Sequence, residues 1–281
     1  MKKLADYSKF ASRFFIKLAI GVLALILLVY YPIGMIWVHE IDDSPDFSIE
    51  TYRVENGSEA VATAIALVAR ETEINHWTPS DPFFYPGYAL NRMPAFQRGI
   101  IASIARFTIE LSDQIARTRG SSSVDEDVQK ANGLFNYSPY VWMFDPSTSW
   151  LPTTSSATQY KAGKESLIRY QKRLSEGHAI FERRSDNLLE ALNRIAADLG
   201  SSSAEIDSYV EGKTKTSYGS AGELFYYTKG RLYANYMLLK ALEKDFSVVI
   251  EERQLKPAWE KMLEEKPNST VPTAASTRPM L

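Results

Sequence analysis

The longest run of apolar positions in the chain lies close to the N-terminus. Between Leu18 and Val38 there are 21 residues without a charged side chain. A helix rises about 1.5 Å per residue, so this run covers the roughly 30 Å hydrocarbon core of a bilayer. Lipid offers the backbone no hydrogen-bond partners, and the run must therefore be helical. We predict a transmembrane helix over residues 18–38, with Tyr30 and Tyr31 near one membrane interface.

The charges on the two sides of this run are opposite in sign. Residues 1–17 carry five basic side chains and one acidic one, whereas residues 39–52 carry five acidic side chains and no Lys or Arg. The positive-inside rule then places residues 1–17 in the cytoplasm and everything after residue 38 outside. Residues 39–57 are predicted to form an acidic, extended linker.

Two other kinds of segment share some of these features. A cleaved signal peptide also begins with basic residues, but its apolar core is shorter and ends at small side chains. Here the run ends in Tyr-Tyr-Pro-Ile-Gly-Met, which offers no such cleavage site. A buried core helix rarely has this many uncharged residues in succession. The sequence therefore favours an uncleaved membrane anchor.

Beyond the linker, apolar positions recur at helical spacing. The clearest segment runs from Met93 to Arg119, where one apolar stripe steps by three or four residues: Phe96, Ile100, Ile104, Phe107, Leu111 and Ile115. Further helices are predicted over residues 58–76 with Ser58 as the cap, 157–200, 201–210 and 220–253. No internal repeat is visible, which argues against a solenoid.

Two segments between these helices are rich in proline and aromatic residues, namely 77–87 and 134–156. We predict loops there, the second with short extended pieces or a hairpin. Residues 266–281 are small, polar and interrupted by proline, and are predicted to be disordered. The fold class is therefore all-α: one transmembrane helix followed by an antiparallel, bundle-like helical domain over residues 58–265.

Composition excludes several kinds of function. The 281 residues have a net charge of −2, which argues against nucleic-acid binding. There is no cysteine, so disulfides, thiolate zinc sites and cysteine nucleophiles are excluded. Three scattered histidines, His39, His76 and His178, leave little material for a histidine-built metal centre.

Catalytic and cofactor motifs are also missing from the sequence. Glu73 and His76 have the E-x-x-H spacing, but a di-iron bundle needs two such motifs and two further glutamates. There is no G-x-S-x-G elbow and no phosphate-binding glycine loop. The acidic run 125–127 lacks the alternate spacing of a calcium loop. We predict no catalytic residue, no cofactor and no metal, and the sequence favours a protein that is not an enzyme.

Two groups of residues remain as candidates for function. The aromatic side chains Tyr140, Trp142 and Trp150 are candidates for an interface with a partner, although such loops also form lids on a core or rest at a bilayer surface. Arg183, Arg184, Asp186 and Arg231 form the second group.

An arginine on an apolar helix face, such as Arg231, is costly to bury unless it is paired. We expect a structural ion pair with Asp186 or Glu223 across packed helices. The alternative is an anion site for phosphate or lipid headgroups, which would use the same residues.

Several blocks of sequence carry a family resemblance. They are NRMPAFQRGI at 91–100, WLPTTSSATQYKAGKESLIRYQKRL at 150–174, FERRSDNLLEALNRIAADLGSSS at 181–203 and ELFYYTKGRLYANYMLLKALEKDF at 223–246. Together they resemble an uncharacterised family of Gram-negative inner-membrane proteins, a domain of unknown function. The resemblance implies a short cytoplasmic N-terminus, one span and a periplasmic helical domain, and it implies no activity. Family members continue into a further apolar helix, so the last helix here is expected to lack a neighbour or to recruit one from another chain.

These observations predict a membrane-anchored periplasmic structural or interaction protein, a subunit or scaffold of a cell-envelope complex in the bacterial inner membrane. Its expected partners are the membrane, through a single span, and an envelope protein or further copies of the chain, with no nucleic acid. The alternative is an envelope enzyme or a lipid- or ligand-binding domain that acts near the membrane surface, around Arg183, Asp186 and Arg231.

Overall fold

The computed structural model describes residues 2–38, 41–116, 124–144, 150–212 and 218–264, with the backbone alone for residues 2–14 and Leu27. Within these ranges every regular element is a helix and no strand occurs. The prediction of an all-α fold is therefore confirmed. The tail predicted at 266–281 lies outside the described residues.

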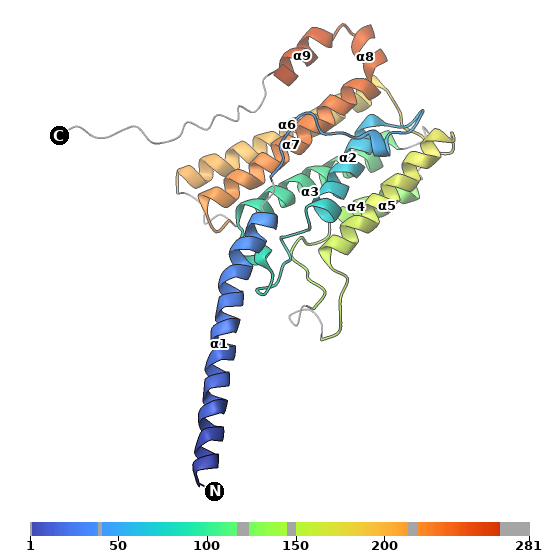
Figure 1. Cartoon of the computed structure of the whole chain (residues 1–281). Helices are drawn as coiled ribbons and strands as arrows, with labels where there is room; N and C mark the ends of the chain where they lie inside the picture. Colours follow the sequence, from blue (N-terminus) through green and yellow to red (C-terminus); the bar gives the residue numbers. More distant parts are fainter. Residues whose placement is uncertain (1, 39–40, 117–123, 145–149, 213–217, 265–281) are drawn as a thin grey trace, which may run out of the picture.

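The first helix, α1 (Lys2–Val38), projects from one end of a helical body (Figure 1). Its part from Phe15 to Val38 is long and apolar enough to cross a membrane, and no other described helix is. Most of the described side chains between Phe15 and Val38 are exposed. The predicted span at 18–38 falls inside this segment.

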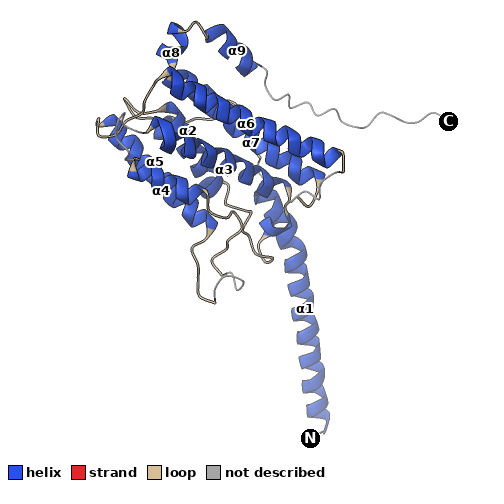
Figure 2. Ribbon diagram, turned by 180° about the vertical axis from the view of Figure 1, so that it is seen from behind, coloured by secondary structure: helices blue, strands red, loops and turns tan. Residues whose placement is uncertain are grey.

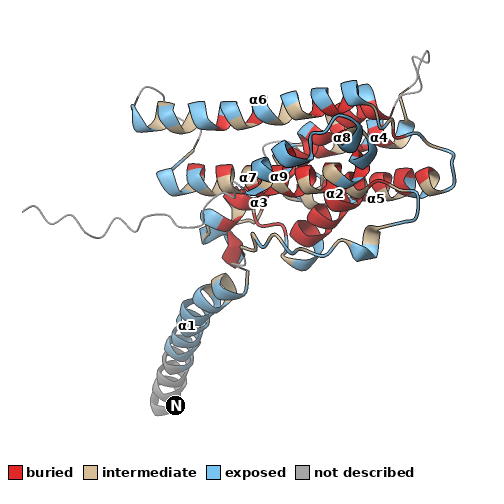
Figure 3. Ribbon diagram, turned by 90° about the horizontal axis from the view of Figure 1, so that it is seen from above, coloured by how far each residue is buried: buried red, intermediate tan, exposed pale blue. Residues whose placement is uncertain are grey.

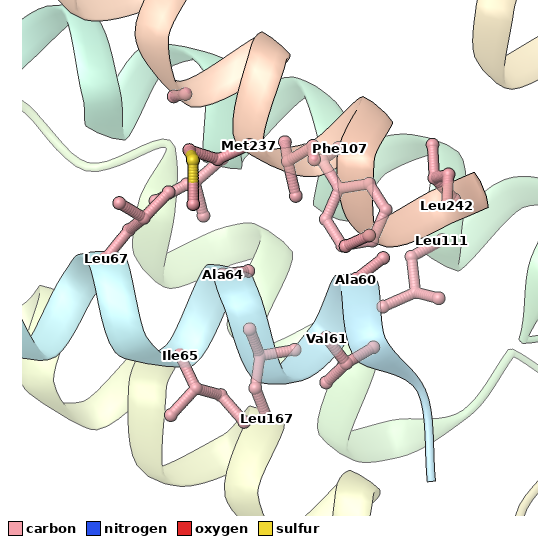
Figure 4. Packing of buried hydrophobic residues seen from close by; sticks show 14 of the residues in the cluster. Ala60, Val61, Ala64, Ile65, Leu67, Phe107, Leu111, Leu167, Met237 and Leu242 are labelled. Atoms are coloured by element: carbon pink, nitrogen blue, oxygen red, sulfur yellow. The ribbon is translucent and has the colours of Figure 1, made fainter. Parts of the chain in front are cut away.

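The centre of the body is α2 (Glu59–Ala69), in which every residue from Ala60 to Ala69 is buried. Ser58 caps this helix as predicted, because its hydroxyl accepts a hydrogen bond from the Val61 amide. Figure 4 shows the apolar side chains of α2 between Leu167 on one side and Met237 and Leu242 on the other.

Five further helices belong to the body (Figures 2 and 3): α3 (Arg92–Glu110), α4 (Glu126–Phe135), α5 (Ser156–Ser175), α6 (Ser185–Val210) and α7 (Ala221–Asp245). The main contacts of α2 are with α5 and α7, whereas α4 packs on α3 and α5, and α6 packs on α3 and α7. Most neighbouring helices run antiparallel, as α2 and α7 illustrate. Ser58, just before α2, donates to Asp245 at the end of α7, whereas Arg70, just after α2, donates to the hydroxyl of Tyr233 earlier in α7. The largest helix–helix contact is between α3 and α7, which run parallel. Along both chains in the same direction, Gly99 lies against Tyr227 and the Ser103 hydroxyl donates to the Arg231 carbonyl.

Some helix boundaries differ from the prediction. The helices α2 and α3 each end in a π-helical turn, at Arg70–Ile74 and Leu111–Ile115. The predicted polar connection around residues 125–127 begins α4, and α6 continues through Gly200, where a break was predicted. The helix predicted over 157–200 is interrupted: α5 ends at Ser175, Gly177 follows in a left-handed conformation with φ of 74°, and α6 begins at Ser185.

Two short helices follow α7, namely α8 (Ser247–Glu252) and α9 (Lys256–Glu264). The sequence predicts no helix at α9, and the family resemblance implies that the last long helix lacks a neighbour or recruits one from another chain. Instead α9 folds back on α7 and buries Trp259, which is only 4% exposed.

Residues 41–53 belong to the predicted linker, whose described part is 41–57, and they include η1 (Glu50–Tyr52). This segment is attached to the body. The Ser44 carbonyl accepts a hydrogen bond from the Tyr233 hydroxyl at 3.0 Å, and the Pro45 carbonyl accepts one from Lys240 at 3.0 Å. Asp43 pairs with Lys229 at 2.8 Å. We call residues 41–53 the strap, because it fastens the chain after α1 to α7.

Candidate interaction surface and buried ion pairs

Two proline- and aromatic-rich loops project from the body beside α1 and extend toward the N-terminal end of that helix (Figures 1 and 2). The first, residues 82–90 with η3 (Pro86–Ala89), packs directly on α1. The Tyr30 hydroxyl donates to the Phe84 carbonyl at 3.3 Å, and the Tyr31 hydroxyl donates to the Phe83 carbonyl.

The contact uses one face of the last two turns of α1. Tyr31, Gly34, Met35 and Val38 are half-buried and follow the spacing of a helix face. Gly34 is needed there, because a β-carbon at that position would lie 2.3 Å from Cγ of Pro86. The anchor helix and the body are thus joined by close packing as well as by the chain.

The second loop, residues 136–155 without the undescribed 145–149, packs on the first. The ring of Trp142 lies 5.4 Å from that of Phe84. The two limbs of this loop pair through their backbones, from the Thr153 amide to the Met143 carbonyl at 2.8 Å and from Ser156 to Val141 at 2.9 Å. The limbs therefore lie side by side as in the hairpin that the sequence left as an alternative, although neither limb forms a strand.

Together the two loops expose a large apolar area. Its exposed side chains are Phe83, Phe84, Tyr85, Tyr88, Tyr140, Met143, Phe144, Trp150 and Leu151. We call these nine residues the aromatic surface. No charged residue occurs at 82–91, 131–144 or 150–160. Exposed apolar residues gathered on neighbouring loops are typical of contacts with a protein or a membrane.

The three candidate interface residues all belong to these loops, in different environments. Trp150 is 91% exposed and Tyr140 is 57% exposed, whereas Trp142 is half-buried against Phe84 and Phe144. The Tyr140 ring is held in place by Arg98, whose guanidinium lies 5.2 Å from the ring centre and donates to the hydroxyl. Arg98 in turn pairs with Glu223.

The arginine that the sequence placed on an apolar face is buried and paired, as expected, but with a different carboxylate. Arg231 and Asp198 have side chains only 6% and 5% exposed and form an ion pair. Asn235 also donates to Asp198, at 3.1 Å, and Arg231 donates to the Ser201 hydroxyl at 3.1 Å. The expectation that Asp186 or Glu223 pairs with Arg231 is wrong.

A sequence signal for Asp198 was present. It lies on the inward stripe of α6, at positions 188, 191, 195, 198 and 202, where every other member is small or apolar. A carboxylate on such a stripe predicts a cationic partner on the facing helix. The prediction named Asp186 or Glu223 instead, and Asp186 lies on the same helix 12 residues before Asp198, more than three helical turns away.

The other candidate residues lie at the opposite end of the α6–α7 pair. Arg184 and Asp186 form an exposed ion pair at 2.7 Å, and Arg183 donates to the Gly57 carbonyl at 2.8 Å. Arg183 also lies 3.9 Å from Asp245, which is 14 residues from Arg231 along α7, or about 21 Å. The four residues therefore do not form one anion site.

Asp245 has a structural role that the sequence did not reveal. It accepts hydrogen bonds from the Ser58 hydroxyl at 2.7 Å and from the amides of Glu59 and Ala60 at 2.9 Å each, at the start of α2. A carboxylate at a helix N-terminus satisfies amides that have no partner within the helix. Burial nevertheless raises the pKa of Asp245.

A second buried pair lies in the π-helical turn after α2. The Arg70 guanidinium donates to Glu71 at 2.7 Å, to the Tyr233 hydroxyl at 3.0 Å, and stacks on Phe47 of the strap. Burial raises the pKa of Glu71, whose side chain is fully buried. These contacts tie the strap to α2 and α7.

The E-x-x-H pair does not come together as a site. Glu73 pairs with Lys164 at 2.7 Å, whereas His76 lies beyond the helix with φ of 55° and contacts Asp81 at 2.9 Å. Among the described residues no group of three His, Asp or Glu side chains has the arrangement of a metal site.

Comparison with known proteins gave one match. Residues 12–214 match the family described as "Uncharacterized protein conserved in bacteria (DUF2333)". No curated protein and no solved structure matches the chain. The match begins within α1 and ends before α7, although α7 packs on both α2 and α3 in the core.

Proposed function

The chain belongs to this bacterial family of unknown function, and we propose that it is a membrane-anchored structural or interaction protein of the cell envelope. In this proposal α1 spans the inner membrane once, with residues 1–17 in the cytoplasm. The helical body lies in the periplasm and acts as a subunit or scaffold of an envelope complex.

The observation that carries the proposal is the attachment of the body to its anchor. One face of α1 packs on the loop at Phe83–Pro86, and the strap is bonded to α7 through Ser44 and Pro45. Two separate attachments fix the height and orientation of the body above the membrane. A subunit needs this, because it must present the same face to a neighbour in the same bilayer, whereas a domain on a flexible tether samples many orientations.

The proposed topology rests on the distribution of charge around α1. Five basic residues precede the apolar run and five acidic residues follow it. A signal sequence near an N-terminus has a similar apolar helix, so the mass of the purified chain is the direct check. An intact N-terminus supports the anchor, and a mass that lacks α1 contradicts it.

The test of function is crosslinking in living cells, followed by gentle solubilisation and mass spectrometry of a C-terminally tagged chain. We expect a stoichiometric envelope protein or a second copy of the chain among the crosslinked products. The Gly34→Leu variant should lose most of this product, because its side chain cannot fit against Pro86 and the body is no longer held on α1.

Gly21→Leu is the matched control, because nothing lies within 4 Å of a β-carbon at Gly21. Both variants should remain in the membrane and keep their helical circular dichroism. The proposal fails if the wild-type chain gives no stoichiometric product, and the role of rigid attachment fails if Gly34→Leu crosslinks like Gly21→Leu.

The alternative function, an enzyme or ligand-binding domain, depended on Arg183, Asp186 and Arg231 acting together. These residues lie in separate contacts, with Arg231 held by Asp198 and Arg184 by Asp186. No described feature gathers them around a common ligand, so the interaction role is the better-supported proposal.

A further inference from the structure

The aromatic surface is continuous with the lipid-facing surface of α1. Its first loop lies against Tyr30, Tyr31 and Gly34, while Ile33, Ile36 and Trp37 on the other faces of the same turns are exposed. Both loops extend alongside α1 in the direction of its N-terminus, away from the body (Figures 1 and 2). If α1 spans a bilayer, these loops are the part of the body nearest to it.

The length of α1 gives the depth of the contact. The uncharged run of the helix begins at Leu18, directly after Lys17, and a hydrocarbon core of roughly 30 Å takes about 20 residues of helix. Counted from Leu18, the outer boundary of the core falls near Trp37, about one helical turn beyond Gly34, the residue that touches Pro86. The loop at Phe83–Pro86 therefore meets α1 within about one turn of the boundary between hydrocarbon and headgroups.

The composition of the surface suits that layer. Of its nine residues, seven are aromatic and three of those seven are tyrosines, which place an apolar ring and a polar hydroxyl at the membrane interface. No charge occurs in the described parts of the two loops. A surface that faced water would leave the apolar rings of Trp150 and Phe83, each more than 70% exposed, in contact with solvent.

Several backbone amides and carbonyls of the two loops have hydrogen-bond partners within the protein, which suits a medium with little water. The carbonyls of Phe83 and Phe84 accept hydrogen bonds from the two tyrosine hydroxyls of α1, and the Tyr85 amide donates to the Pro82 carbonyl at 2.8 Å. In the second loop the limbs pair with each other, as described above. Irregular backbone is tolerated near lipid only where its polar groups are satisfied in this way.

We propose that the aromatic surface lies in the interfacial layer of the outer leaflet of the same bilayer that α1 spans. The body then has two membrane contacts, the helix and the aromatic surface, which together fix its tilt. This inference rests on the proposed membrane anchor, but it does not depend on any protein partner.

The absence of cysteine from the chain makes a direct test possible. The full-length chain is placed in nanodiscs of phosphatidylethanolamine and phosphatidylglycerol, with single cysteines at Phe83→Cys, Trp150→Cys or Leu189→Cys labelled with an environment-sensitive fluorophore. Leu189 is the control, because it is 60% exposed near the start of α6, a helix that packs on α3 and α7.

We expect the labels at 83 and 150 to emit at shorter wavelength than the label at 189. Nitroxide lipids should quench them, and a nitroxide near the headgroup should quench more than one at the chain end. The label at 189 should report water. If the labels at 83 and 150 report water while the chain remains in the nanodisc, the inference is wrong and the membrane anchor stands.

A second readout separates lipid from protein as the occupant. Benzoylphenylalanine at position 150 is irradiated in cells, and the adduct is identified by mass. Lipid adducts support the inference. A protein adduct as the main product overturns it, assigns the surface to a partner and leaves the proposed interaction role intact.

Discussion

At the scale of single residues, burial of charge is the dominant feature of the body. Arg231 and Asp198 are almost fully buried and share hydrogen bonds with Asn235 and Ser201. Taking two charges out of water is expensive, and a buried pair repays this only with good geometry and further hydrogen bonds. Removal of one partner leaves the other charge buried without compensation.

We therefore expect Asp198→Ala to lower the free energy of unfolding by about 3–5 kcal/mol. The double variant Asp198→Leu with Arg231→Met should be markedly more stable than Asp198→Ala, because no unpaired charge remains. Chemical denaturation of the full chain in detergent, followed by circular dichroism, measures both. Equal losses in the two variants would mean that the pair contributes packing volume rather than charge compensation.

Glu71 gives the molecule a pH dependence whose sign follows from its pKa. Burial raises this pKa above the ordinary value of 4.5, so between the two values the folded state binds a proton more readily than the unfolded state. The contribution of Glu71 therefore makes the protein more stable as the pH falls through the raised pKa toward 4.5. It becomes less favourable as the pH rises.

As the pH falls through that window, the free energy of unfolding of the Glu71→Gln variant should rise less than that of the wild-type chain. Denaturation midpoints measured at several pH values above 4.5 provide the comparison. An unchanged pH dependence would show that Glu71 does not titrate differently in the folded state.

At the scale of elements, the packing of α3 on α7 sets the geometry of the core. A β-carbon at Gly99 would lie 2.2 Å from the Tyr227 carbonyl oxygen, and one at Gly230 would lie 2.1 Å from that of Phe96. The two helix backbones therefore touch at this crossing. No flexible side chain can give way there, because the atoms in contact are backbone atoms.

Gly230→Ala should accordingly lower the free energy of unfolding, by about 1–3 kcal/mol, because the helices must move apart. Gly200→Ala is the matched control in α6, where nothing lies within 4 Å of the new methyl group. The control should gain about 0.5–1 kcal/mol from its better helix propensity. A similar gain in both variants would contradict the close crossing.

The sequence predicted the long helices well, because their apolar stripes and caps are strong local signals. It predicted no helix at α4, although Asp125 caps that helix by accepting from the amides of Asp127 and Val128. Three consecutive acidic residues resembled a solvated loop, and a buried stripe of only Val128, Ala131 and Phe135 is short. The π-helical turns after α2 and α3 depend on tertiary packing, which has no local signal.

The candidate residues show the same limit. Local pattern was enough to predict that Arg231 is buried and paired, but the partner depended on which faces of α6 and α7 meet. The aromatic loops were visible as composition, and their position beside α1 was not. That position depends on contacts between residues more than 50 apart, such as Tyr31 with Phe83.

At the scale of the whole molecule, the anchor, the strap and the aromatic loops form one assembly. The family match ends at residue 214, yet α7 supplies Arg231, Tyr233 and Asp245, which bind α6, the strap and α2 respectively. The folded body therefore extends beyond the matched residues. If α1 spans a membrane as proposed, the orientation of the body relative to that membrane follows from the contact between α1 and the first aromatic loop.

That contact is the central claim, and a disulfide tests it most directly because the chain has no native cysteine. The pair Gly34→Cys with Pro86→Cys places two thiols at the packed position, because replacing Pro86 removes the ring atom Cγ that lies closest to a side chain at residue 34. In the control pair, Gly21→Cys with Pro86→Cys, the first cysteine lies about 20 Å along α1 from the packed position at residue 34. In membrane vesicles under mild oxidation, we expect an intramolecular crosslink in the first pair and none in the second. Absence of a crosslink at 34 and 86 in the folded chain would show that the body hangs from α1 on a flexible tether.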